Sequence, residues 1–108
     1  MAANEARFRE ANDAIEAHAH SLGIDDSIPF VCECADRRCT EIIRLSRSEY
    51  LAVRTDPHHF AVAPGHERVS GASAITIGQR PQYSVVRKIG VAGDVAEALD
   101  RTPEPELD

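Results

Sequence analysis

All three cysteines of this chain lie within eight residues, in the run FVCECADRRC at positions 30–39. A chain of 108 residues with five aromatic residues and no Trp has a thin hydrophobic core, so it gains from a metal ion or another cross-link. The number of cysteines is odd, and Cys32 and Cys34 are too close for an easy disulfide, so a secreted disulfide framework fits poorly. The cluster indicates a thiolate metal site, with a reactive thiol or buried packing cysteines as alternatives.

Zinc is the metal that this pattern favours, because structural zinc sites take four ligands and often combine three cysteines with one histidine. In an extended segment Cys32 and Cys34 point to the same face, while Glu33 points away. The four residues 35–38 then permit a turn that returns Cys39 to the same ion. The sequence therefore predicts a Zn²⁺ site with these three thiolates.

A histidine is expected as the fourth ligand, and the chain contains five histidines. His66 is the first choice, because the preceding Pro64 and Gly65 form a tight turn that holds an imidazole at the end of a strand. His59 is the second choice, since only one of the adjacent His58 and His59 can face a given side of a strand. The predicted ligand set is Cys32, Cys34, Cys39 and either His66 or His59.

The rest of the chain predicts one α+β domain over residues 1–101, followed by a disordered acidic tail over 102–108. Apolar spacing predicts an amphipathic helix over 4–22 that ends at Gly23. The apolar stripe of this helix comprises Phe8, Ala11, Ile15, Ala19 and Leu22. Strands of a small, mostly antiparallel sheet are predicted over 28–34, 41–45, 59–63, 74–77 and 82–89.

Two shorter helices are predicted from their capping signals. Ser46 and Glu49 form a capping box for a central helix, which the residues 56–57, Asp-Pro, bring to an end. A weaker capping box starts at Asp94 and predicts a short C-terminal helix through Arg101. Both helices belong to the same predicted domain.

Charge is distributed unevenly along the chain. The total is −6, but residues 37–88 contain nine basic and four acidic residues, a net charge of +5 between two acidic ends. Packing of the acidic ends against the basic middle explains this pattern. The alternative is a surface for an anionic partner, either nucleic acid or an acidic protein patch. That surface comprises Arg37, Arg38, Arg44, Arg47 and Arg54, of which the first two also offset the charge of the thiolates.

These features favour a small non-catalytic zinc module that binds another protein in a regulatory role. A zinc module that binds nucleic acid through the segment 37–88 is the alternative, although its acidic ends and scarce aromatics count against it. Catalysis is less favoured, because no P-loop, Gly-x-Gly-x-x-Gly or nucleophile elbow is present. The candidate general bases Glu33 and Glu67 fit better as solvated surface carboxylates. The N-terminal composition and the absence of a long apolar stretch predict a cytoplasmic protein without a membrane partner, of unspecified oligomeric state.

Further short motifs accompany the cysteine cluster. They are Glu-Tyr at 49–50, Val-Arg at 53–54, Pro-Gly-His at 64–66 and Tyr-Ser-Val-Val at 83–86. Together with FVCECA and its third cysteine, this pattern resembles a family of small, largely uncharacterised actinobacterial proteins. The resemblance covers most of the chain apart from the tail and implies no activity. It implies a ligand set of Cys32, Cys34, Cys39 and His66, which favours His66 over His59.

Overall fold

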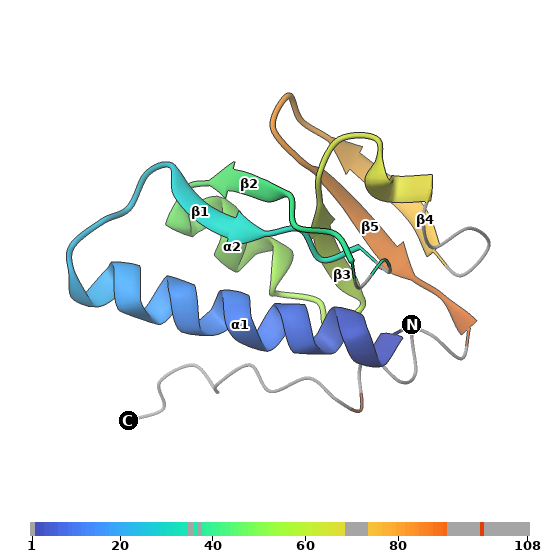
Figure 1. The fold of residues 1–108 in the computed structure, drawn as a ribbon, viewed down its shortest axis with the longest axis horizontal. Coiled ribbons are helices and arrows are strands. Elements are labelled where there is room, and N and C mark those ends of the chain that lie inside the picture. The colour runs from blue at the N-terminus through green and yellow to red at the C-terminus, as the bar shows by residue number, and fades with distance from the viewer. Residues whose placement is uncertain (1, 35, 37, 69–73, 91–97, 99–108) are drawn as a thin grey trace.

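The computed structural model describes residues 2–34, 36, 38–68, 74–90 and 98. Its elements follow one another as α1 (Ala2–Ser21), β1 (Ile28–Val31), β2 (Ile42–Leu45), α2 (Arg47–Val53), β3 (His59–Val62), β4 (Ala74–Gln79) and β5 (Ser84–Lys88) (Figure 1). The predicted α+β class is confirmed. The predicted C-terminal helix and acidic tail lie outside the described residues, apart from Ala98.

The strands form two small antiparallel sheets rather than one. β1 and β2 form a hairpin, and the second sheet has the order β3-β5-β4. A backbone hydrogen bond of 2.8 Å from Glu33 N to Ala61 O joins the end of the hairpin strand to β3. In Figure 1 the hairpin and α2 lie along the C-terminal half of α1, and the three-stranded sheet stands beside its N-terminal half.

The apolar core lies between the hairpin, α2 and the three-stranded sheet. Phe30 of β1 stacks on Tyr50 of α2 with ring centroids 4.3 Å apart, so the hairpin and this helix share one aromatic contact. The other large buried side chains of this core are Ile28, Ile43, Leu45, Val53, Phe60, Val62, Tyr83 and Val86. This core supports the hairpin end from which two of the cysteines project.

The start of α2 follows the sequence prediction. Ser46 Oγ accepts a hydrogen bond from Glu49 N at 3.1 Å, and the Glu49 carboxylate accepts one from Ser46 N at 2.8 Å. This reciprocal pair is the predicted capping box. The helix ends at Val53 with Arg54 as its C-cap, earlier than the predicted Asp-Pro stop.

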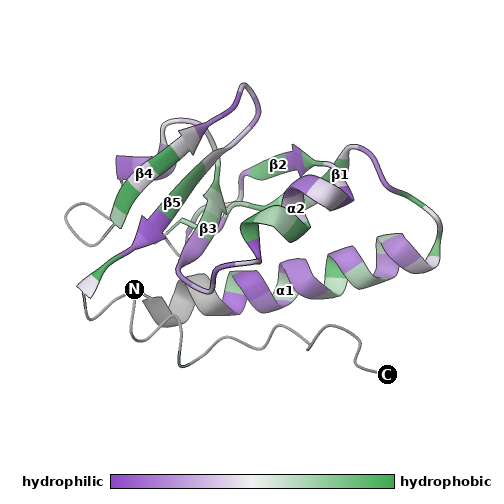
Figure 2. Ribbon diagram, turned by 180° about the vertical axis from the view of Figure 1, so that it is seen from behind, coloured by the Kyte–Doolittle hydropathy of each residue, from purple (hydrophilic) through white to green (hydrophobic). Residues whose placement is uncertain are grey.

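The buried face of α1 combines apolar and polar residues, which corrects part of the predicted apolar stripe. Ala19 is buried and Ile15 packs against the core, as predicted. Arg9 and Asn12 are buried, whereas Leu22 is 60% exposed and, of the predicted stripe, only Ala19 is fully buried. Figure 2 shows hydrophilic residues along much of this helix. The physical reason is pairing: Asn12 exchanges two hydrogen bonds of 2.8 Å with the backbone of Val31 and so extends the edge of β1.

The N-terminal end of α1 is held by Arg9. Its guanidinium donates hydrogen bonds to the carbonyl oxygens of Pro57, at 2.6 Å, and His59. The same group lies 3.9 Å from the ring centre of Phe60, within the range of a cation–π contact.

Among the described residues, no helix combines the length and hydropathy needed to cross a membrane.

Candidate metal centre

The structure brings Cys32, Cys34, Cys39 and His66 together, with their ligand atoms all within 4.8 Å of one another. Two of the cysteines follow β1 directly, the third lies in the connection to β2, and the histidine follows β3. Cys32 and Cys34 are buried, while Cys39 and His66 are partly exposed. The four side chains are close enough to bind one metal ion.

The hairpin connection positions Cys39. A hydrogen bond of 3.0 Å from Cys32 N to Glu41 O continues the strand pairing beyond β1 and β2. Asp36 then organises the return: its carboxylate accepts from Arg38 N at 2.9 Å, and its backbone carbonyl accepts from Cys39 N at 3.0 Å. Aspartate favours such local turns, because its short side chain bonds to backbone two residues on. The third sulfur therefore returns to the first two.

A tight turn positions His66. His66 N donates to Ala63 O at 2.9 Å, and the two residues between them are Pro64 and Gly65. Gly65 has φ +89°, the left-handed value that the third position of a type II turn requires. The turn at this place is the one predicted from the sequence, and it carries the imidazole to the cysteines.

The sulfur–nitrogen distances match those of a tetrahedral zinc site. Cys32 Sγ lies 3.6 Å and Cys39 Sγ 3.5 Å from His66 Nδ1. In a tetrahedron with Zn–S of about 2.3 Å and Zn–N of about 2.0–2.1 Å, sulfur and nitrogen are about 3.6 Å apart. These two sulfurs and the imidazole nitrogen therefore have the spacing that a shared Zn²⁺ ion requires.

Hydrogen bonding between thiols and imidazole explains this geometry less well. A neutral imidazole nitrogen offers one lone pair or one proton, so His66 Nδ1 satisfies only one sulfur at a time. Here two sulfurs approach that nitrogen at nearly equal distances. A cation bound by all four ligand atoms would account for both contacts.

The protonation of the thiols bears on how the site is loaded. Burial raises the pKa of Cys32 well above its ordinary value, although a hydrogen bond of 3.1 Å from Ala63 N to Cys32 Sγ acts in the opposite direction. Burial likewise raises the pKa of Cys34. Because a metal binds the thiolate, an incoming ion must displace these protons.

No family model, curated protein or solved structure matches the chain. The geometry of the ligand cluster therefore carries the functional argument. The donor set of three sulfurs and one imidazole suits zinc and other soft or borderline divalent ions.

The second histidine candidate lies elsewhere. His59 Nε2 is 3.4 Å from Asp56 Oδ2 and 3.5 Å from the guanidinium of Arg87, and it does not belong to the cysteine cluster. Its neighbour His58 also contacts Asp56, at 3.0 Å. The structure thus places His66, and not His59, beside the three sulfurs.

The predicted arginine surface is wrong for Arg54. This side chain is buried, and it binds Asp13 through two nitrogens at 2.9 and 3.0 Å. Arg47 is paired with Glu16 of α1 at 2.6 Å. Arg38 and Arg44 are exposed, and Arg37 lies outside the described residues. The acidic N-terminal helix thus engages two of the arginines, as intramolecular complementarity predicts.

The prediction that Glu33 is a solvated surface carboxylate is also wrong. Glu33 is 0% exposed, and its two oxygens accept hydrogen bonds from Ala61 N and from the amide of Asn12. Burial raises the pKa of Glu33, against the opposing effect of the nearby Arg9. The sequence signal for its burial was the position of Glu33 between two cysteines, because an extended segment can be covered on both faces. No comparable sequence signal indicated that Asn12 is its partner.

Glu67, the other candidate general base, is partly buried. It accepts a hydrogen bond of 2.6 Å from the Ser84 hydroxyl, which holds the pKa of Glu67 below its usual range. Both carboxylates nearest to the ligands in sequence are therefore engaged by protein donors.

Proposed function

We propose that this chain is a metal-stabilised module in which Cys32, Cys34, Cys39 and His66 bind one Zn²⁺ ion, and that it acts by binding another protein. The observation that carries the proposal is the convergence of four ligand atoms from two separate loops within 4.8 Å. In small domains the free energy of binding a structural zinc is at the same time folding free energy. Such a role suits a chain with a thin apolar core.

A structural role is supported over a catalytic one. Structural zinc sites are filled by four protein ligands, whereas catalytic sites keep a position open for water or substrate. Four protein ligand atoms are available here. Glu33 and Glu67, which a zinc hydrolase could use as bases, are held by other donors.

An apolar groove beside α1 supports a protein partner. Leu22 is 60% and Ile24 46% exposed, and they border a groove of about 350 Å³ that Ile15, Ile28 and Pro29 also line. Apolar surface of this kind suits aliphatic or aromatic side chains of a protein segment and not phosphates. Burial of Arg54 weakens the nucleic-acid alternative.

A cytoplasmic location and membership of the actinobacterial family belong to this proposal and rest on the sequence patterns.

Removal of the metal tests the structural role. Zinc-loaded protein is treated with a chelator and followed by circular dichroism and thermal unfolding. We expect loss of the folded signal and its recovery with Zn²⁺ but not with Mg²⁺, because Mg²⁺ prefers oxygen ligands. An apoprotein that keeps its spectrum and melting temperature contradicts the proposal. Binding of the protein to immobilised DNA or RNA that weakens steeply as salt rises would instead favour the nucleic-acid-binding module.

A further inference from the structure

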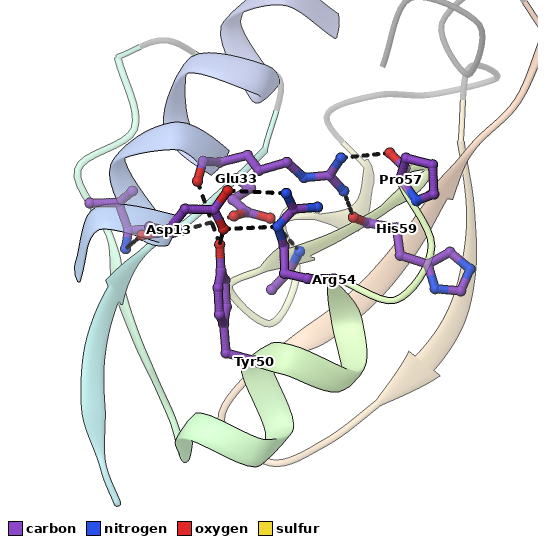
Figure 3. Close-up of polar contacts among 10 residues, drawn as sticks. Asp13, Glu33, Tyr50, Arg54, Pro57 and His59 are labelled. Carbon is purple, nitrogen blue, oxygen red and sulfur yellow. Dashed lines mark hydrogen bonds and ion pairs between the residues drawn. The ribbon is translucent and has the colours of Figure 1, made fainter. Parts of the chain in front are cut away.

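The buried carboxylate of Glu33 stands between two metal ligands in sequence but does not belong to the ligand cluster. It lies among the polar side chains that connect α1, α2 and β3, beside Asp13, Tyr50 and Arg54 (Figure 3). Each of its oxygens accepts a hydrogen bond from a different element. Glu33 is therefore a junction between the ligand loop and two elements that contribute no cysteine.

The first arm of this junction reaches β3. Glu33 N donates to Ala61 O at 2.8 Å, and Ala61 N donates to the Glu33 carboxylate at 2.9 Å, so both backbone polar groups of Ala61 pair with Glu33. Two residues along the same chain, Ala63 N donates to Cys32 Sγ at 3.1 Å. His66 follows through the turn that Ala63 begins. Glu33 thus fixes the cysteine loop against the segment that presents the imidazole.

The second arm reaches α1. The amide of Asn12 donates to the Glu33 carboxylate at 2.8 Å and exchanges two further hydrogen bonds with the backbone of Val31. Asn12 therefore contacts the residues on both sides of Cys32. Both Asn12 and Glu33 are 0% exposed, so each depends on the other for a hydrogen-bond partner.

We propose that Glu33 is a positioning residue of the metal centre, and that it couples metal binding at the cysteines to the docking of α1. This inference rests on the proposed metal-binding function. By linkage, a docked helix raises metal affinity by the same factor by which the bound metal favours the docked helix. Binding or loss of the metal would then change how firmly α1 is docked, and with it the surface that α1 forms.

Glu33→Gln tests the coupling, because a glutamine keeps the shape but replaces one acceptor with a donor. Its amide nitrogen then faces the amide nitrogen of Asn12, and two donors oppose each other. Loss of outer-shell support typically lowers metal affinity by about 10- to 100-fold, and we expect a decrease of this size for Zn²⁺ in a chelator competition. The absorption spectrum of the Co²⁺-loaded variant should also change, since it reports the arrangement of the ligands.

A double-mutant cycle separates positioning from general destabilisation. Asn12→Ala in the Glu33→Gln background removes the donor that opposes the new amide, so the combined loss of Zn²⁺ affinity should be smaller than the sum of the two single losses. Ser46→Ala is the matched control, because it removes a helix cap that makes no hydrogen bond to Glu33 or Asn12. We expect the control to keep the wild-type Co²⁺ spectrum. Where Glu33→Gln does not fold, Asn12→Ala gives the same test from α1.

The outcomes distinguish this inference from the function on which it rests. If the wild-type chain binds no metal, the proposed function fails first. If the wild-type chain binds one Zn²⁺ while Glu33→Gln and Asn12→Ala keep its affinity and Co²⁺ spectrum, only the coupling is overturned. An equal loss of affinity and an equal spectral change in Ser46→Ala also overturns it.

Discussion

Cys32 Sγ and His66 Nδ1 lie 3.6 Å apart although 34 residues separate them in the sequence. The chain between them contains the rest of the hairpin, α2 and β3. A metal ion that joins the two ligands closes this loop and restricts the unfolded chain, in addition to forming bonds in the folded state. The site is therefore well placed to stabilise the connection between the two sheets.

The ion pair between Asp13 and Arg54 attaches α1 to the end of α2. The Arg54 side chain is 2% exposed, and Tyr50 also donates to Asp13 at 2.6 Å. Asp13→Ala removes the carboxylate that binds two nitrogens of this buried guanidinium, so we expect the free energy of unfolding to fall by about 3 kcal/mol. Tyr50→Phe removes one hydrogen bond and should cost about 1–2 kcal/mol. Urea unfolding measures both changes, and a loss below 1 kcal/mol for Asp13→Ala contradicts this account.

The capping box of α2 gives a second stability prediction. Ser46→Ala removes the acceptor for Glu49 N, so we expect a decrease of about 1 kcal/mol in the free energy of unfolding. Gln82→Ala, at an exposed position between β4 and β5, is the control and should have little effect. Equal changes in the two variants would show that the cap is not the cause.

The lowered pKa of Asp56 predicts how the free energy of unfolding depends on pH. Burial disfavours its charge, but hydrogen bonds from His58 and Arg87 outweigh this effect and hold the pKa of Asp56 well below its usual range. A pKa that is lower in the folded than in the unfolded chain contributes stability above the unfolded value, about 3.9, and loses it as pH falls. Asp56→Asn should therefore destabilise the protein at pH 7, by at most about 1 kcal/mol for so exposed a group. A difference that persists undiminished at pH 2 contradicts this explanation.

Metal binding itself should depend on pH. Because burial raises the pKa of both Cys32 and Cys34, each thiol releases a proton when it binds zinc at neutral pH. Zn²⁺ affinity should therefore rise with pH and fall as the solution becomes acidic. Titration in weak buffer with a pH indicator measures the protons released; the Cys32→Ser/Cys34→Ser double variant is the control. Proton-free binding by the wild-type chain would refute thiolate ligation.

Local sequence signals predicted much of the fold. The capping box at Ser46, the turn formed by Pro64 and Gly65, and the pairing of the two strands around the cysteines all depend on residues close together in the chain. The interactions behind these signals form between neighbouring residues, so they do not depend on how the rest of the chain packs. The spacing of the cysteines likewise indicated the cluster that the structure assembles.

The packing of α1 could not be predicted in the same way. Helical spacing selected Phe8 and Leu22 as its buried side, but burial is determined by the partner surface, which here offers backbone groups of β1 and the carboxylate of Glu33. Asn12 is buried because it satisfies those groups. The same holds for Arg54, whose burial depends on Asp13, 41 residues away. Nothing in the local sequence reports such distant pairing.

The metal content of two histidine variants tests the central claim most directly. His66→Ala removes the ligand that lies beside the sulfurs, and His59→Ala removes the histidine that the structure places next to Asp56 instead. Native mass spectrometry of protein purified with Zn²⁺ should show one zinc per chain for the wild type and for His59→Ala. It should show loss or marked weakening of that zinc for His66→Ala and for alanine at each cysteine. A wild-type chain without zinc, or His66→Ala with a full complement bound as tightly as in the wild type, contradicts the account.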